Sequence, residues 1–339
     1  MTMQRWMRSY RAAGVAVATA AALLSAGCGG GEQAPAGGGS AAGDAKVCDP
    51  VPGQELVVLE DDKHLQTVDN VIPAISQKAA TPPLTKTLDA VSATLTTDDL
   101  IGLNRQVVVE RQTSANAAKA YVEDKGLLDK VATGGSGKVV IGAANFAENQ
   151  TIASIYELVL DRAGFDASTE TIGNRELYAP ALMRGEVQVV PEYVGTLTKY
   201  LNKKANGANA APRASGDVDK TVAALTELGE AQGLVFGKRS QAADQNAFAV
   251  TKGFADEHGV TTLSDLSSTC GGGVSLGGPP DCNSPERVFC RPGLEKTYGL
   301  KIDKFQALDA GGPLTKTAVK QGKVALGLVF SSDGELAAG

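Results

Sequence analysis

The sequence predicts an α/β fold with two doubly wound lobes. From residue 138 to the end, short apolar runs typical of buried strands alternate with amphipathic helical patterns. The chain has 339 residues, enough for two lobes, and its 43% hydrophobic and 21% charged residues are typical of a globular protein. Polar side chains follow several expected strands, at the sheet edge where open α/β proteins bind small ligands.

Residues 1–28 are expected to form a lipoprotein signal peptide. Three arginines precede an apolar run at residues 12–24, and Cys28 ends a lipobox-like Ser-Ala-Gly-Cys sequence. The run is too short and too rich in alanine for a membrane span. We therefore expect an extracytoplasmic protein anchored to the cell membrane by a lipid on Cys28, with residues 29–53 as a flexible tether. A cleaved soluble signal is the alternative, because Leu24 lies one place further from the cysteine than usual.

The charge of the chain argues against nucleic acid as a partner. There are 32 basic and 38 acidic residues, and removal of the signal deletes three arginines and no acids. The remaining chain is strongly acidic, and acidic chains bind phosphate backbones poorly.

Four further cysteines indicate two disulfides, because an even number in an exported protein is typical of such bridges. Cys282 and Cys290 bracket a short loop and form the favoured pair, which leaves Cys48 with Cys270. The other two pairings stay open from the sequence alone. A zinc site is disfavoured, because the spacing differs from that of paired C-x-x-C motifs.

The first half of the chain is expected to be mainly helical. A buried-type strand at residues 55–60 leads into a polar loop at residues 61–70. Three helices are then expected without a strand between them, because Pro and capping residues precede apolar helical patterns. Their expected first or capping residues are Pro82, Thr97 and Ser114, and the last helix ends at Gly126. A Gly-rich stretch at residues 128–137 is a linker.

Strands and helices alternate after the linker. The expected strands are residues 139–141, 168–172, 187–190, 234–236, 247–251, 274–276 and 324–330. A helical pattern after the first strand ends at Gly164, and another covers residues 218–228. Residues 202–215 are polar and small, as in a surface excursion, and residues 244–246 are expected to cross between lobes.

No reaction centre is visible in the sequence. His64 and His258 are the only histidines and have no metal-ligand spacing, and the common nucleophile, zinc-protease and dinucleotide motifs are absent. We expect no enzyme activity, no metal and no cofactor.

Aromatic and polar residues gather where strands end. Those proposed to contact a ligand are Tyr193, Thr196, Phe248, Phe330, Arg287, Asn145 and Asn246. Rings that converge on a cleft suit a quaternary ammonium by cation–π attraction, and an arginine can pair with a carboxylate. Phe248 and Phe330 could equally be core residues of their strands, because periodicity does not separate the two roles.

Five blocks of the sequence resemble one protein family. They are VVIGAANFAENQ, GNRELYAPALMRGEVQVVPEYVGTL, NAFAVTKGFADEHGVTTLSDL, RPGLEKTYGL and LGLVFSSDGELAAG. They resemble the substrate-binding proteins of ABC importers for glycine betaine, choline and related osmoprotectants. The resemblance implies a type II periplasmic-binding-protein fold, two lobes that close on the ligand, no catalysis, and a membrane permease as partner. We expect a monomer.

Residues 56–126 also resemble this family, but they resemble its carboxyl-terminal part. The chain therefore looks circularly permuted, with residues 128–137 joining the family's usual termini. Lobe one would then comprise residues 70–127 and 138–244, and lobe two would comprise residues 54–69 and 245–339.

The resemblance also assigns ligand contacts. It places Tyr193, Phe248, Phe330 and Asp69 in an aromatic cage, and Thr196 and Arg287 at the polar end of the ligand. Asp69 stands where some betaine binders carry a tyrosine, and Ala144 stands where a lysine or glutamine often reaches the ligand. A carboxylate in the cage would favour cations such as choline over zwitterions. There are two alternatives. The ligand is another small amine or amino-acid derivative, or the chain is a secreted sensory or scavenging binding domain without a transporter.

Overall fold

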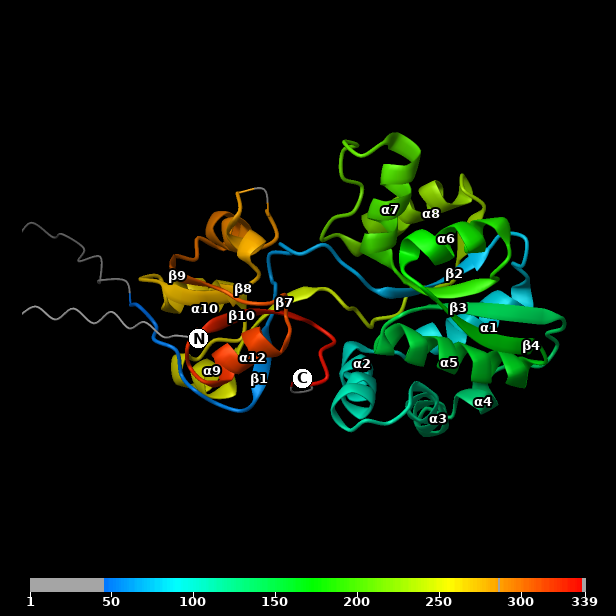
Figure 1. Cartoon of the computed structure of the whole chain (residues 1–339), viewed down its shortest axis with the longest axis horizontal. Helices are drawn as coiled ribbons and strands as arrows, with labels where there is room; N and C mark the ends of the chain where they lie inside the picture. Colours follow the sequence, from blue (N-terminus) through cyan, green and yellow to red (C-terminus); the bar gives the residue numbers. More distant parts are fainter. Residues whose placement is uncertain (1–45, 286, 337–339) are drawn as a thin grey trace, which may run out of the picture. The chain divides into compact units, whose positions relative to one another are not determined.

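The computed structural model describes residues 46–285 and 287–336, which contain two five-stranded sheets flanked by helices (Figure 1). The predicted signal, Cys28 and most of the predicted tether lie outside these residues. The strand order is β4-β3-β5-β2-β6 in one sheet, here called the β3 sheet, and β1-β7-β10-β8-β9 in the other, here called the β8 sheet. The predicted alternation of strands and helices is therefore confirmed.

The β3 sheet is mixed rather than wholly parallel. β3 pairs in parallel with β4 and β5, whereas β2 pairs antiparallel with both β5 and β6. Its strands are β2 (Val71–Ser76), β3 (Lys138–Ala144), β4 (Asp166–Gly173), β5 (Val189–Tyr193) and β6 (Leu234–Phe236). The associated helices are α1 (Pro82–Ser92), α2 (Thr97–Asn104), η1 (Arg105–Val109), α3 (Ser114–Asp124), α4 (Leu127–Lys130), α5 (Ala147–Ala163), α6 (Arg175–Arg184), α7 (Val194–Asn206) and α8 (Val218–Glu230).

Strand β2 corrects the expectation that helices alone follow the loop at residues 61–70. All six of its residues are buried, because each face of the strand meets a different group of helices. Val71 and Ile75 pack with α1, α3 and α5, whereas Ile72 and Ala74 pack with α6, α7 and α8. Pro73 weakens the local strand signal of this segment, since proline cannot donate to a ladder. Here it lies directly opposite Pro191 of β5.

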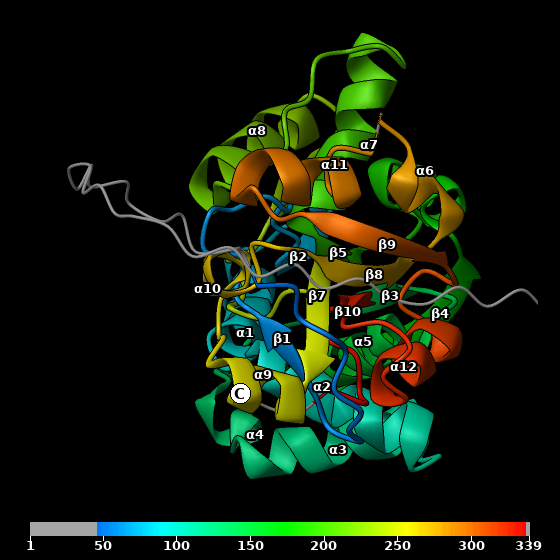
Figure 2. The same ribbon diagram turned by 90° about the vertical axis from the view of Figure 1, so that its left-hand side faces the viewer.

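The β8 sheet is also mixed, with β7 antiparallel to β1 and β10, and β8 parallel to β10 and β9. Its strands are β1 (Leu56–Leu59), β7 (Asn246–Thr251), β8 (Val274–Gly278), β9 (Ile302–Ala307) and β10 (Leu326–Phe330). Its helices are α9 (Lys252–His258), α10 (Leu263–Thr269), η2 (Pro280–Asn283), α11 (Arg291–Gly293), η3 (Leu294–Tyr298) and α12 (Pro313–Lys320). α12 contacts β10, β7 and β8 (Figure 2). β9 was not predicted from the sequence.

Several boundaries differ from the prediction by a few residues. The hydroxyls that cap α2 and α3 belong to Thr96 and Thr113, one residue before those expected. β3 continues through Gly142, because both faces of this strand are covered and it needs no polar alternation. Gly164 ends α5 with φ 104°, as its position in the sequence predicted.

The chain passes between the two sheets at two places, residues 60–70 and 237–245. These segments run side by side: Asn70 bridges Ala243, and the N–H of Asp244 donates to the carbonyl of Asp69 at 3.1 Å. A third segment joins them where the N–H of Ser331 donates to the carbonyl of Gln245 at 2.9 Å. In the part of the chain that the structure describes, no helix has the length and apolar character needed to cross a membrane.

Candidate functional site

A cavity of about 270 Å³ lies where the segments between the sheets meet the carboxyl ends of the strands. Its wall is formed by Gln66, Thr67, Asp69, Phe146, Arg175, Tyr193, Thr196, Lys199, Asp244, Gln245, Asn246, Phe289 and Phe330. These residues come from both sheets and from the connecting segments, so the cavity exists only in the folded chain.

Four aromatic rings border the cavity: Phe146, Tyr193, Phe289 and Phe330. The rings of Phe146 and Tyr193 lie 6.2 Å apart between centroids. Phe146, Phe289 and Phe330 are 44%, 38% and 41% exposed, which is unusual for phenylalanine in a well-packed protein. Exposed rings around one hollow indicate a surface made for contact with something else.

Tyr193 is held from behind by a buried carboxyl group. Its hydroxyl donates to Glu148 Oε1 at 2.7 Å, and Asn104 Nδ2 donates to Glu148 Oε2 at 2.6 Å. Burial raises the pKa of Glu148 to about 7, and the nearby Asp244 carboxylate acts in the same direction. Burial likewise raises the pKa of the Tyr193 hydroxyl, so that this side chain remains neutral.

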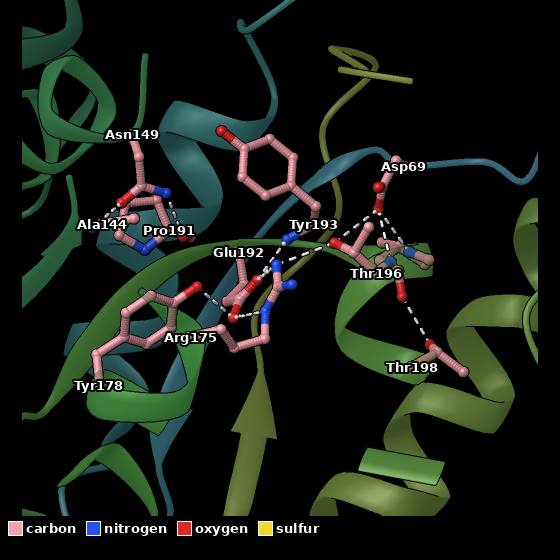
Figure 3. Close-up of polar contacts among 12 residues, drawn as sticks. Asp69, Ala144, Asn149, Arg175, Tyr178, Pro191, Glu192, Tyr193, Thr196 and Thr198 are labelled. Carbon is pink, nitrogen blue, oxygen red and sulfur yellow. Dashed lines mark hydrogen bonds and ion pairs between the residues drawn. The ribbon is translucent and has the colours of Figure 1, made fainter. Parts of the chain in front are cut away.

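Arg175, the first residue of α6, forms a two-armed ion pair with Glu192 of β5 (Figure 3). Its Nε and Nη2 atoms each lie 2.8 Å from a carboxylate oxygen, and Nη2 also donates to Thr196 Oγ1 at 2.9 Å. The Tyr178 hydroxyl and the N–H of Tyr193 complete the contacts of Glu192. This carboxylate is therefore fully compensated although its side chain is only 1% exposed.

Asp69 closes the amino-terminal end of α7. Its Oδ1 accepts hydrogen bonds from the N–H groups of Gly195 and Thr196 at 2.8 and 2.9 Å (Figure 3). A Cβ atom at Gly195 would clash with the carbonyl oxygen of Val68, so glycine is required for this approach. Burial raises the pKa of Asp69 to about 7, because desolvation outweighs these two hydrogen bonds.

Phe289 reaches the cavity from the loop between Cys282 and Cys290. Gln66 Nε2 donates to the carbonyl of Phe289 at 2.8 Å, and Lys199 Nζ lies 5.3 Å from the centre of its ring. The structure contains a disulfide between Cys282 and Cys290, which limits the freedom of this loop. A second disulfide joins Cys48 to Cys270.

A scan against models of protein families matches residues 51–124 and 137–338 to the substrate-binding domain of ABC-type glycine betaine transport systems. The chain belongs to this family. Family membership and the two helix-flanked sheets confirm the predicted type II binding-protein fold. The family model describes substrate-binding domains of transport systems.

A curated relative in this family is the glycine-betaine-binding protein of Pseudomonas aeruginosa, 27% identical over 215 residues. The match covers 58% of this chain and 62% of the relative's length. Solved structures that resemble parts of the chain include Haemophilus influenzae OppA in complex with RPPGFSPFR, at 12% identity and a TM-score of 0.23. MppA, a periplasmic murein tripeptide binding protein in its unliganded open form, gives 10% identity and a TM-score of 0.23. Each structural match covers 55% of this chain and 44% of the other.

Within this family member, the cavity brings together five of the residues proposed from sequence. They are Asp69, Tyr193, Thr196, Asn246 and Phe330. Phe248 lies elsewhere: it is 1% exposed and packs in the core of the β8 sheet. Arg287 is exposed and paired with Asp281 beside a neighbouring hollow. Asn145 borders a third hollow, together with Ala144.

The cavity wall also contains residues that were not proposed as ligand contacts from the sequence, among them Phe146, Arg175, Lys199, Asp244 and Phe289. Phe146 and Arg175 each follow closely on the carboxyl end of a parallel strand, β3 and β4, so strand ends did carry a signal for them. Lys199 and Phe289 had no such signal, because their place at the cavity depends on contacts between distant segments.

Proposed function

We propose that this protein is an extracytoplasmic solute-binding lipoprotein of an ABC importer that binds a quaternary ammonium compound such as glycine betaine or choline. It delivers this solute to a membrane permease. The observation that carries the proposal is the group of four rings around one cavity, Phe146, Tyr193, Phe289 and Phe330. The relative's printed name, a glycine-betaine-binding protein, points to the same class of ligand.

The chemistry of the ligand explains why rings are suited to it. A quaternary ammonium has no N–H donor, so it cannot be held by carbonyl or carboxylate hydrogen bonds. Its charge is spread over methyl groups, which pack on the negative faces of aromatic rings for about 0.5–2 kcal/mol per good contact. Asp69 and Asp244 add negative potential to the same wall.

We infer two lobes that close on the ligand, one formed by residues 70–127 and 138–244 and the other by residues 54–69 and 245–339. The two segments that connect the sheets would act as the hinge, because they are the places where the chain passes between the sheets. A ligand that touches both lobes stabilises the closed form and so changes the surface presented to the permease.

Circular permutation and a lipid anchor on Cys28 belong to the same proposal. In support of the permutation, β1 and β10 are strands of one sheet, and Leu336 bridges Leu56 near the start of β1. The family match is also interrupted between residues 124 and 137, where the linker between the usual termini is expected. The lipobox-like sequence that ends at Cys28 supports the anchor.

Isothermal titration calorimetry of the purified protein tests the proposed function. Glycine betaine, choline, carnitine and amino-acid betaines should include a ligand, whereas primary amines and amino acids without N-methyl groups should bind far more weakly. Tyr193→Ala should remove most of the affinity, because it deletes the ring that ends β5. Absence of heat with every trimethylammonium compound would reject the proposal. Tryptophan fluorescence is unsuitable, since the only tryptophan is Trp6, within the predicted signal.

A further inference from the structure

The wall of the cavity carries two acidic and two basic side chains, and three of these four are already bonded within the protein. Arg175 is engaged by Glu192 and Thr196. Asp69 accepts two peptide N–H groups of α7, and Asp244 accepts the hydroxyl of Ser332 at 2.9 Å. The remaining charge is that of Lys199.

Lys199 has no ion pair and no hydrogen bond from its ammonium group to any residue in the described ranges 46–285 and 287–336. Its contact is the ring of Phe289, 5.3 Å from Nζ to the centroid. Lys199 is exposed by surface area, but the atoms packed around its side chain still lower the pKa of its ammonium group, against the opposing effect of the Asp69 carboxylate. An anion beside Nζ would offset this desolvation.

The amino-terminal end of α7 would otherwise attract a ligand carboxylate, because helix N-termini bind anions. Here Asp69 already occupies the N–H groups of Gly195 and Thr196. A ligand carboxylate that enters the cavity must therefore pair with a positively charged side chain.

Lys199 is placed to supply that charge. It lies three residues after Thr196 on α7, so both side chains project from the same face of the helix, and both line the cavity. A lysine side chain is a mobile point charge on a four-carbon stem, so Nζ can leave the ring of Phe289 to meet a ligand.

The same lysine also affects which rings receive the ligand's ammonium group. Phe289 already faces an internal cation, and a second positive charge there would be repelled by Lys199. The rings of Phe146, Tyr193 and Phe330 carry no lysine or arginine within cation–π distance among the described residues. The cavity wall therefore contains three rings that face no internal cation and one ring, Phe289, that already faces Lys199.

We propose that Lys199 pairs with a carboxylate of the ligand, so that the cavity prefers a zwitterionic quaternary ammonium compound to a purely cationic one. This inference rests on the proposed function, since it assumes that the rings receive a quaternary ammonium. It names the substrate class more narrowly and assigns Lys199 as the residue that determines it.

Calorimetry with glycine betaine and choline tests the inference, because both carry a trimethylammonium group and only glycine betaine carries a carboxylate. The wild-type protein should bind glycine betaine more tightly. Lys199→Met keeps the apolar stem and removes the charge; it should weaken glycine betaine about tenfold and change choline less than about threefold. Lys199→Arg should retain the preference. Lys203→Met, one turn further along α7 and outside the cavity, is the matched control and should change neither.

The outcomes separate the inference from the function on which it rests. A wild-type preference for choline, or a Lys199→Met variant that loses both ligands equally, overturns the role of Lys199 and leaves quaternary ammonium binding in place. Binding of neither compound to the wild-type protein overturns both. High salt should lower the glycine betaine affinity of the wild type but not that of Lys199→Met, because salt screens the ion pair; equal salt dependence in the two proteins would contradict the pairing.

Discussion

The hydroxyl of Tyr193 donates a 2.7 Å hydrogen bond to Glu148, so a ring on the cavity wall is positioned by a carboxyl group inside the protein. Glu148 in turn accepts from Asn104, whose Nδ2 also donates to the carbonyl of Ser332 at 2.8 Å. Through these contacts the ring is connected to the segment that follows β10.

Tyr193→Phe should separate the ring from its anchor. The variant keeps an aromatic face for the ligand but leaves Glu148 with one partner fewer, which should lower the free energy of unfolding by about 1–3 kcal/mol. Urea denaturation checks the loss of stability, and calorimetry should show much less loss of affinity than in Tyr193→Ala. Equal losses of affinity in the two variants would contradict a ligand role for the ring.

Glu148→Gln should change how stability depends on pH. The pKa of Glu148 is raised to about 7 in the folded protein from its ordinary value of 4.5, so the folded state binds more protons than the unfolded state between these values. Stability from this group is therefore present at low pH and is lost as pH rises toward 7. Glutamine resembles the protonated carboxyl. The variant should match wild type near pH 5 and exceed it by about 1–3 kcal/mol near pH 8. Urea denaturation at both pH values checks this. The prediction is wrong if the difference in free energy of unfolding between variant and wild type is the same at pH 5 and pH 8.

Arg175→Gln should be strongly destabilising. It removes the main counter-charge of Glu192, whose side chain is 1% exposed, and breaking one side of a buried ion pair costs about 3–5 kcal/mol. The double variant Arg175→Gln with Glu192→Gln should recover part of this loss in chemical denaturation. Arg184→Gln is the control: it breaks a fully exposed pair with Glu186 and should have little effect. The idea fails if both single arginine variants behave alike.

Asp69→Asn should reduce affinity for cations more than for zwitterions. The amide oxygen can still accept from the N–H groups of α7, so the helix cap persists while the negative charge is removed. Because burial raises the pKa of Asp69 to about 7, its charge is larger at pH 8 than at pH 6. Choline affinity of the wild type, measured by calorimetry, should therefore fall as pH is lowered from 8 to 6. A variant with the same pH profile as wild type would exclude Asp69 as the cause.

The two disulfides should have different roles. Cys48–Cys270 spans 222 residues, so its double serine variant should lose about 2–5 kcal/mol of stability with little change in affinity of the folded protein. Cys282–Cys290 spans 8 residues and holds the loop that carries Phe289. Its double serine variant should weaken ligand binding with a smaller loss of stability, because the closed loop is short. Calorimetry and denaturation on both variants provide the comparison.

Local patterns predicted most of the fold. The sequence placed the carboxyl end of α5 correctly at Gly164, because a glycine stop is a local signal. It also placed β6 correctly at Leu234–Phe236, because an apolar run is a local signal. β2 was missed for the opposite reason. Its six residues are buried by two separate groups of helices, and Pro73 weakens the only local signal that it has.

The candidate site was predictable in part. Tyr193 and Thr196 were proposed because they lie at and just after the end of β5, and both line the cavity. Phe248 illustrates the limit: it occupies a strand like Phe330, but the first is 1% exposed and the second 41%. Periodicity does not say which ring faces the core and which lies at the end of the sheet beside the cavity.

By itself the sequence determined the α/β alternation, the family resemblance and the aromatic residue at the end of β5. Only the tertiary structure decided that Asp69 caps a helix 126 residues away, and that Lys199 of α7 lies over Phe289 of the disulfide loop. The physical reason is separation along the chain. Strands, helices and turns depend on neighbouring residues, whereas the charge of the cavity depends on which distant side chains packing brings into contact.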